Sequence, residues 1–164
     1  MDTDSFSKRD LIYLKAAGQV SKLSDHRTQV GCVIVNKHRI ISSGNNSATK
    51  CHPIQKDLDT REFNCECAGK VHAESDAIIY CLKNNIDLKN ATIYVYREHK
   101  DGSFANARPC SRCMSLIKKY GIRKIKYTTN AGYASEFVMK EFSEHGNKFL
   151  PQKEKSTRQD YSSR

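Results

Sequence analysis

The sequence has no apolar run of eighteen or more residues, and this absence excludes a transmembrane helix. The first four residues, Met1–Asp4, are polar and acidic, so no signal peptide is expected. We therefore predict a cytoplasmic protein with no membrane partner. No internal repeat is visible either. The 164 residues fit one domain, predicted over residues 1–150, followed by a basic tail, 151–164, that is predicted to be disordered.

The seven cysteines do not predict disulfides, because no secretion signal accompanies them. Cys110 and Cys113 form a C-x-x-C pair, which by itself could be redox-active or half of a zinc ribbon. A ribbon needs a second C-x-x-C, and the chain has only the tighter spacing of Cys65 and Cys67. The meaning of Cys110 and Cys113 therefore depends on what accompanies them.

Two short motifs supply that context, His72-Ala73-Glu74 and Pro109-Cys110-Ser111-Arg112-Cys113. One imidazole and two thiolates suit Zn²⁺, which prefers nitrogen and sulfur ligands in a tetrahedron. Three protein ligands leave the fourth position to water, as in catalytic zinc sites. We predict a zinc site formed by His72, Cys110 and Cys113. Glu74 is the candidate catalytic residue, because it follows His72 closely enough to act on that water without ligating the metal.

Hydrophobic patterning predicts alternating helices and strands. The predicted helices cover residues 7–23, 73–83, 110–120 and 135–144. The predicted strands cover residues 29–35, 40–43, 92–96 and 124–128, with a short closing element at 149–150. Residues 45–70 are predicted to be a long irregular loop. This order implies a three-layer α/β/α sandwich with a mixed sheet, in which both metal motifs lie at helix N-termini.

The spacing H-x-E followed by P-C-x-x-C is known from zinc-dependent nucleobase deaminases. On these residues the chain resembles the cytidine deaminase superfamily over residues 8–130, and the hairpin at 29–46 resembles that of deoxycytidylate (dCMP) deaminases. The resemblance implies a mixed five-stranded sheet, a catalytic zinc and hydrolytic deamination, most closely of dCMP to dUMP and ammonia. A histidine as the first ligand also fits deaminases of tRNA adenosine and of single-stranded polynucleotide cytidine. It fits free-cytidine deaminases less well, since these usually carry cysteine there.

The same resemblance implies substrate contacts. In dCMP deaminases an asparagine just after the second strand contacts the sugar, and Asn46 matches it, or Asn45 if the register shifts by one residue. Ala73 and Tyr133 are further candidates, although Tyr133 could equally be a turn aromatic without a role. The net charge of +10 predicts an anionic partner, namely nucleic acid, a nucleotide phosphate or an acidic protein. A homo-oligomer is implied by the family resemblance alone.

Two segments depart from the family pattern. Residues 97–108 separate the third strand from P-C-x-x-C and contain the turn dipeptide Asp101-Gly102, so we predict a hairpin beside the substrate pocket. The 45–70 loop carries Cys51, Cys65 and Cys67. With His99 these cysteines could hold a second, structural zinc, or they could be incidental thiols.

Three functions are compared on this basis. The first is a deaminase of a cytosine mononucleotide, with the 45–70 and 97–108 segments walling a closed pocket and basic side chains at one end. The second is a polynucleotide deaminase with a wider basic channel. The third is not an enzyme but a zinc-stabilised nucleic-acid-binding module in which Glu74 is a surface residue. The H-x-E spacing and the missing fourth ligand favour an enzyme.

Overall fold

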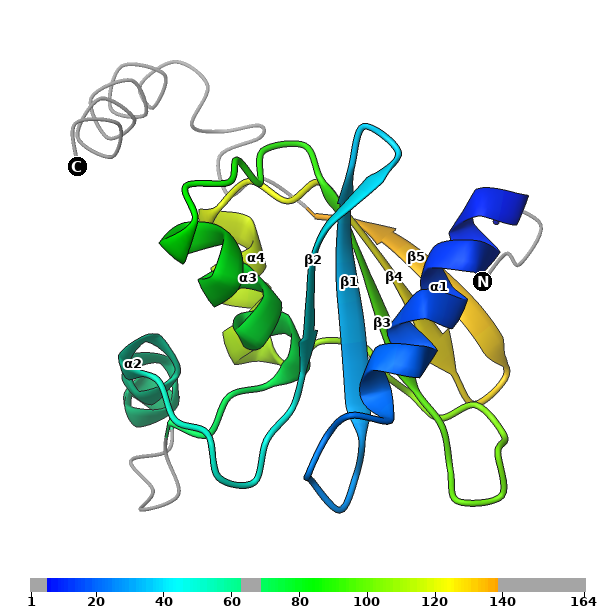
Figure 1. The fold of residues 1–164 in the computed structure, drawn as a ribbon, viewed down its shortest axis with the longest axis horizontal. Coiled ribbons are helices and arrows are strands. Elements are labelled where there is room, and N and C mark those ends of the chain that lie inside the picture. Colours follow the sequence, from blue (N-terminus) through cyan, green and yellow to red (C-terminus); the bar gives the residue numbers. More distant parts are fainter. Residues whose placement is uncertain (1–5, 63–68, 139–164) are drawn as a thin grey trace.

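The computed structural model describes residues 6–62 and 69–138, which form one five-stranded sheet with helices on both faces (Figure 1). The helices are α1 (Lys8–Ser21), α2 (Pro53–Glu62), α3 (Ala73–Lys83) and α4 (Ser111–Lys119). The strands are β1 (Val30–Asn36), β2 (Arg39–Asn45), β3 (Thr92–Arg97), β4 (Lys124–Thr129) and β5 (Gly132–Phe137).

The sheet has the order β2-β1-β3-β4-β5 and is mixed. Strands β3 and β4 are parallel, whereas β1 runs antiparallel to both β2 and β3, and β5 runs antiparallel to β4. Helix α1 covers one face of the sheet, and α3 and α4 lie on the other (Figure 1). The predicted three-layer sandwich with a mixed five-stranded sheet is confirmed.

Strand β1 shows how the sequence forms two cores. Successive side chains of a strand point to opposite faces, so Val33 and Val35 pack against α1 while Cys32 and Ile34 pack against α3. All four are buried, which explains why this segment is a continuous apolar run instead of an alternating one. Helix α1 begins at a capping box formed by Ser7 and Asp10.

The prediction of a helix over residues 135–144 is wrong where the structure describes it. Residues 132–137 form β5, which follows a tight turn from β4 and is paired with it along its whole length. Gly132 has φ +134, a conformation that favours glycine and directs the chain back along β4. Residues such as Glu136 favour helices in isolation, but pairing with β4 overrides that preference. Residues 139–144 and the predicted element at 149–150 lie outside the described residues.

The prediction of an irregular loop over residues 45–70 is also wrong in part, because it contains α2. Pro53 at the first helical position is a favourable helix start. The inward face of α2 carries two polar residues, Gln55 and Asp59, beside Leu58 and Ile54, and all but Ile54 are buried. The apolar periodicity that identifies amphipathic helices is therefore weak here.

No helix in residues 6–62 and 69–138 has the length and apolar character needed to cross a membrane. The cytoplasmic location remains a prediction, as do the domain boundary at residue 150 and the basic tail, which lies outside the described residues.

Candidate active site

The predicted zinc ligands come together at the N-termini of two adjacent helices. His72 is the N-cap residue of α3, and Cys110 is the N-cap residue of α4. The Nδ1 atom of His72 lies 3.7 Å from Sγ of Cys110 and 3.4 Å from Sγ of Cys113. Zn–S and Zn–N bonds of about 2.3 and 2.0–2.1 Å at tetrahedral angles would place nitrogen and sulfur about 3.6 Å apart. The three donors therefore fit one zinc ion.

Protons are shared unevenly among these donors. Hydrogen bonds from Cys113 and His72 lower the pKa of the Cys110 thiol to about 3, in spite of its partial burial. Cys113 donates to the Cys110 sulfur and is buried, and both effects raise its own pKa. The hydrogen bond between His72 and Cys110 raises the pKa of His72, and so does nearby Glu74, although burial lowers it. The lowered pKa of Cys110 favours its thiolate, the form that ligates metals.

Glu74 is buried beside these donors, with 5% of its surface exposed. Burial raises the pKa of its carboxyl group, and the charge of His72 partly offsets that increase. A carboxyl group with a raised pKa holds a proton more readily than an exposed one, which suits a general acid–base residue. The position of Glu74 in the protein interior argues against the surface role that a binding module would give it.

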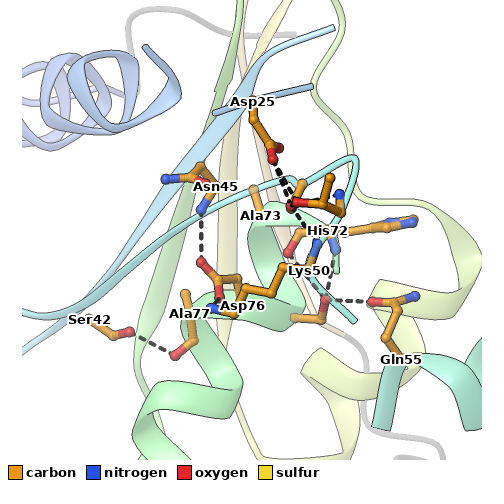
Figure 2. Close-up of polar contacts among 12 residues, drawn as sticks. Asp25, Ser42, Asn45, Lys50, Gln55, His72, Ala73, Asp76 and Ala77 are labelled. Carbon is orange, nitrogen blue, oxygen red and sulfur yellow. Dashed lines mark hydrogen bonds and ion pairs between the residues drawn. The ribbon is translucent and has the colours of Figure 1, made fainter. Parts of the chain in front are cut away.

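Strand β2 and α2 fix the first turn of α3, which carries Glu74 (Figure 2). Oγ of Ser42 donates to the backbone oxygen of Ala77 over 2.7 Å, and the backbone N–H of Asn45 donates to Oδ2 of Asp76 over 3.1 Å. On the α2 side, Ser75 Oγ is hydrogen-bonded to Gln55. Since Ser75 also accepts from the backbone N–H of His72 over 3.0 Å, these contacts set the position of the ligand itself.

Asp59 on α2 links the elements that carry the metal ligands. Its carboxylate accepts from Gln55 Nε2 (2.8 Å), from Arg112 Nη1 (3.0 Å) and from the backbone N–H of Gly69 (2.8 Å). Asp59 is 4% exposed and Gln55 is fully buried, so these contacts act at low dielectric. Sequence reasoning missed this network. The signal that could have found it is a pair of polar residues spaced i, i+4 after a helix-starting proline.

A cavity of about 330 Å³ opens onto the metal site. We call it the substrate cavity, and its size lies within the range of about 300–1,000 Å³ usual for small-molecule sites. Its lining includes His72, Ala73, Glu74 and Cys110. Its walls include Thr28, Val30, Asn46 and Ala107, and its basic lining residues are His26, Lys70, Arg97 and Arg108. Two of the predicted substrate contacts, Asn46 and Ala73, therefore line it.

Asn46 connects the end of β2 to the segment before β1. Its Oδ1 accepts from the backbone N–H of Val30 (2.9 Å) and from Oγ of Ser24 (2.7 Å), and its Nδ2 donates to the carbonyl of Thr28 (2.6 Å). The Val30 N–H requires an acceptor, which fixes the orientation of the amide. Ser24 Oγ has a single hydrogen and also lies 2.6 Å from the backbone oxygen of Asn46, so Oδ1 keeps acceptor capacity when that hydrogen points to the backbone. One hydrogen on Nδ2 has no acceptor among the described residues, so the Asn46 amide can donate to a sugar.

The other two predicted substrate residues have different surroundings. The backbone of Asn45 holds Asp76 on α3, as described above. Tyr133 stacks on Phe6 with ring centroids 5.2 Å apart and contacts Phe104 at 5.3 Å, in the cluster beneath α1. That cluster lies on the sheet face opposite α3, so the surroundings of Tyr133 are those of a packing residue.

The second zinc remains a prediction. Among the described residues, the group formed by His72, Cys110 and Cys113 is the one cluster of three potential metal donors. Cys51 is exposed and its sulfur accepts from Lys70 Nζ over 3.2 Å, while Nε2 of His99 lies 3.3 Å from Oδ1 of Asn130. Cys65 and Cys67 lie outside the described residues.

Residues 97–108 form the predicted hairpin. A bridge joins Glu98 to Phe104, and Gly102 (φ +88) lies in the turn. The returning arm brings Asn106, Ala107 and Arg108 to the substrate cavity. Arg108 pairs with Glu136 through both Nε (2.6 Å) and Nη2 (3.0 Å), so its charge is already compensated. The insertion thus forms one wall of the cavity, as predicted.

Comparison with known proteins agrees with this site. Residues 7–129 match the family described as the cytidine and deoxycytidylate deaminase zinc-binding region. Deoxycytidylate deaminase from Mycobacterium phage D29 is 31% identical over 131 residues, covering 72% of this chain and 92% of that protein. A probable deoxycytidylate deaminase from Caenorhabditis elegans is 29% identical over 153 residues, covering 88% of this chain and 70% of that protein.

Among solved structures, dCMP deaminase from the cyanophage S-TIM5, in complex with dCMP and dUMP, has the same fold with a TM-score of 0.51. Its sequence is 21% identical, and the match covers 79% of this chain and 84% of the phage chain. Residues 7–129, which match the family, contain both metal motifs and all the residues that line the substrate cavity. This chain belongs to the family of zinc-binding cytidine and deoxycytidylate deaminases.

Proposed function

We propose that the protein hydrolyses the exocyclic amine of a cytosine mononucleotide, converting dCMP and water to dUMP and ammonia. The observation that carries this proposal is a buried carboxyl group, Glu74, that lines one cavity with His72 and Cys110, two of the three donors spaced for one zinc ion. The relatives from phage D29 and C. elegans are named as deoxycytidylate deaminases, and the cyanophage enzyme binds dCMP and dUMP. These names support the choice of substrate.

His72, Cys110 and Cys113 would hold the metal. When bound, zinc lowers the pKa of a water molecule from about 15.7 toward about 7, which provides the nucleophile at neutral pH. The Glu74 carboxylate accepts the proton of that water and delivers it to the ring nitrogen of cytosine. It then takes the remaining proton of the added hydroxyl and passes it to the exocyclic amine, which leaves as ammonia while the C–O single bond becomes a carbonyl. One residue can serve both steps because it alternates between base and acid.

The remaining cavity residues bind and orient the nucleotide. The ring enters beside Ala73 at the zinc end, and the free Nδ2 hydrogen of Asn46 donates to a sugar oxygen. The nucleotide phosphate lies toward the basic lining, where Arg97 and Lys70 offer positive charge. The net charge of +10 favours encounter with such an anionic substrate. We also propose, from family membership alone, that the protein forms a homo-oligomer.

The direct test is incubation of the zinc-loaded protein with dCMP, CMP, deoxycytidine and a cytidine-containing oligonucleotide. Ammonia release and the ultraviolet shift from cytosine to uracil measure turnover. We expect turnover of dCMP, and loss of about 10² to 10⁴ in rate in Glu74→Gln with zinc content unchanged. Deamination of the oligonucleotide without action on dCMP would transfer the assignment to polynucleotides. Absence of any turnover in a zinc-loaded, folded protein would favour the binding module.

A further inference from the structure

A second cavity, of about 500 Å³, adjoins the substrate cavity and is strongly basic. We call it the basic cavity. It lies between the segment that joins α1 to β1 and the first arm of the 97–108 hairpin. Thr28 and Arg97 line both cavities, so the two cavities are neighbours that share these residues.

The charges around the basic cavity are strongly unbalanced. Its cationic lining residues are Lys22, Arg27, Arg97 and Lys100, and its acidic lining residue is Glu98. Glu98 is ion-paired with Lys22, so Arg27, Arg97 and Lys100 are not compensated by it. Positive charges gathered in a concavity raise the local potential above that of scattered surface charges. The cavity is thus suited to an anion.

Arg97 stands at the junction of the two cavities and has unused donor capacity. Its Nη1 donates weakly to the carbonyl of Asn106 over 3.4 Å. Its Nε–H is buried, and no acceptor for it exists among residues 6–62 and 69–138. A buried charged donor without a partner costs free energy that an anionic ligand would recover. Phosphate oxygens are acceptors that arginine binds through two donors at once.

We propose that the basic cavity binds a second phosphate group, one that extends beyond the nucleotide occupying the substrate cavity. This rests on the proposed function only in placing the nucleotide. The second phosphate has two chemical sources, namely the β-phosphate of a nucleoside diphosphate or triphosphate, and the phosphodiester that joins a neighbouring nucleotide. The 97–108 insertion, which lines both cavities and supplies Arg97 and Lys100, then has the role of lengthening the site.

The variant for the test is Arg27→Ala with Lys100→Ala, because both residues line the basic cavity and neither lines the substrate cavity. A matched control is Lys8→Ala with Lys15→Ala, which removes the same charge from exposed positions on α1. Steady-state kinetics of the zinc-loaded proteins are compared on dCMP, dCDP and a 5′-phosphorylated dinucleotide with cytidine first. Calorimetric titration with pyrophosphate measures anion binding without turnover.

We expect the double variant to change kcat/KM for dCMP by less than about twofold. We expect at least about a tenfold loss of pyrophosphate affinity and of kcat/KM for an extended substrate, in line with two lost charge-assisted contacts. The control should match the wild type in every assay. If the double variant loses kcat/KM on dCDP alone, the cavity binds a terminal phosphate. If it loses kcat/KM on the dinucleotide, the cavity binds a phosphodiester.

Equal pyrophosphate affinity in the wild type and the double variant would overturn the proposal, even if dCMP is turned over well. Conversely, pyrophosphate binding that depends on Arg27 and Lys100 in a protein without deaminase activity would support the basic cavity and refute the proposed function. The two failures are therefore distinguishable.

Discussion

Gly44 is the residue at which a single added methyl group should damage the active site most directly. It lies in β2, where α3 approaches the strand so closely that a Cβ atom would lie 2.4 Å from the Ala73 oxygen and 2.5 Å from the Ala77 nitrogen. Ordinary contacts begin at 3.4 Å, so Gly44→Ala requires α3 to move outward by about 1 Å. Both colliding atoms belong to backbone that cannot rotate away.

The first turn of α3 carries Glu74 and follows His72 directly, whereas the two cysteines lie on α4. A shift of about 1 Å would therefore change the 3.4 and 3.7 Å separations between His72 Nδ1 and the sulfur atoms. Overpacking of this kind costs about 1–3 kcal/mol of stability. Misplacement of reacting groups by about 1 Å can cost about 10²-fold in rate. We expect Gly44→Ala to unfold at a lower temperature, bind zinc more weakly and lose about 10²-fold in kcat.

Gly31→Ala provides the matched control. A Cβ at Gly31 in β1 would lie 2.2 Å from the Ala17 oxygen and 2.3 Å from the Ser21 nitrogen, so it collides with α1 on the opposite face. It should lower the melting temperature comparably but leave zinc content and activity per folded molecule within a few-fold of wild type. Thermal unfolding, zinc analysis and kinetics below the melting transition compare the two. If Gly44→Ala kept full zinc content and wild-type kcat, the argument from helix position would be refuted.

Three further predictions concern single contacts. Cys113→Ala should remove bound zinc in metal analysis, because the two remaining donors are too few for a stable site, and zinc retention would contradict the ligand set. Asn46→Ala should lower kcat/KM for dCMP with zinc content unchanged. A variant with wild-type kcat/KM would show that Asn46 does not contribute to binding the sugar. Burial by itself raises the pKa of Asp10, but hydrogen bonds from Lys126 and Tyr94 outweigh it and lower the pKa to about 2 from 3.8. The resulting stabilisation of about 2 kcal/mol is fully present above pH 3.8 and is lost toward pH 2. Asp10→Asn should therefore be much less stable than wild type in urea at pH 7 and nearly equal to it near pH 2, whereas a pH-independent difference would disprove the linkage.

The sequence predicted the metal site well because its residues are defined by local spacing. Cys110 and Cys113 are one helical turn apart, and His72 and Glu74 sit at the start of another helix. Such local patterns need only one long-range assumption, namely that the two helix N-termini meet. The order of predicted elements supplied it, since both helices follow strands of one sheet.

The error at β5 has a different cause. Residues 135–137 combine helix-compatible residues with no strict alternation, so local propensity points to a helix. Their actual structure depends on hydrogen bonds to β4, and on Glu136 reaching both Arg108 and Tyr127. Contacts between residues 9 and 28 positions apart are not encoded in a short window of sequence. Pairing with β4 therefore determines the secondary structure of these residues, and local propensity does not.

The polar layer around the zinc site was the least predictable part, and it shows how the site gains its precision. The metal ligands lie at helix starts, where backbone N–H groups are not satisfied within the helix. Ser75 satisfies the N–H of His72, Gln55 binds Ser75, and Asp59 binds both Gln55 and Arg112 next to the ligand cysteines. A hydrophobic inner face on α2 would have been easier to recognise from sequence, but it could not have formed these hydrogen bonds. The buried polar residues Gln55 and Asp59 weaken the apolar pattern of α2, and the same two residues let the helix position the ligands.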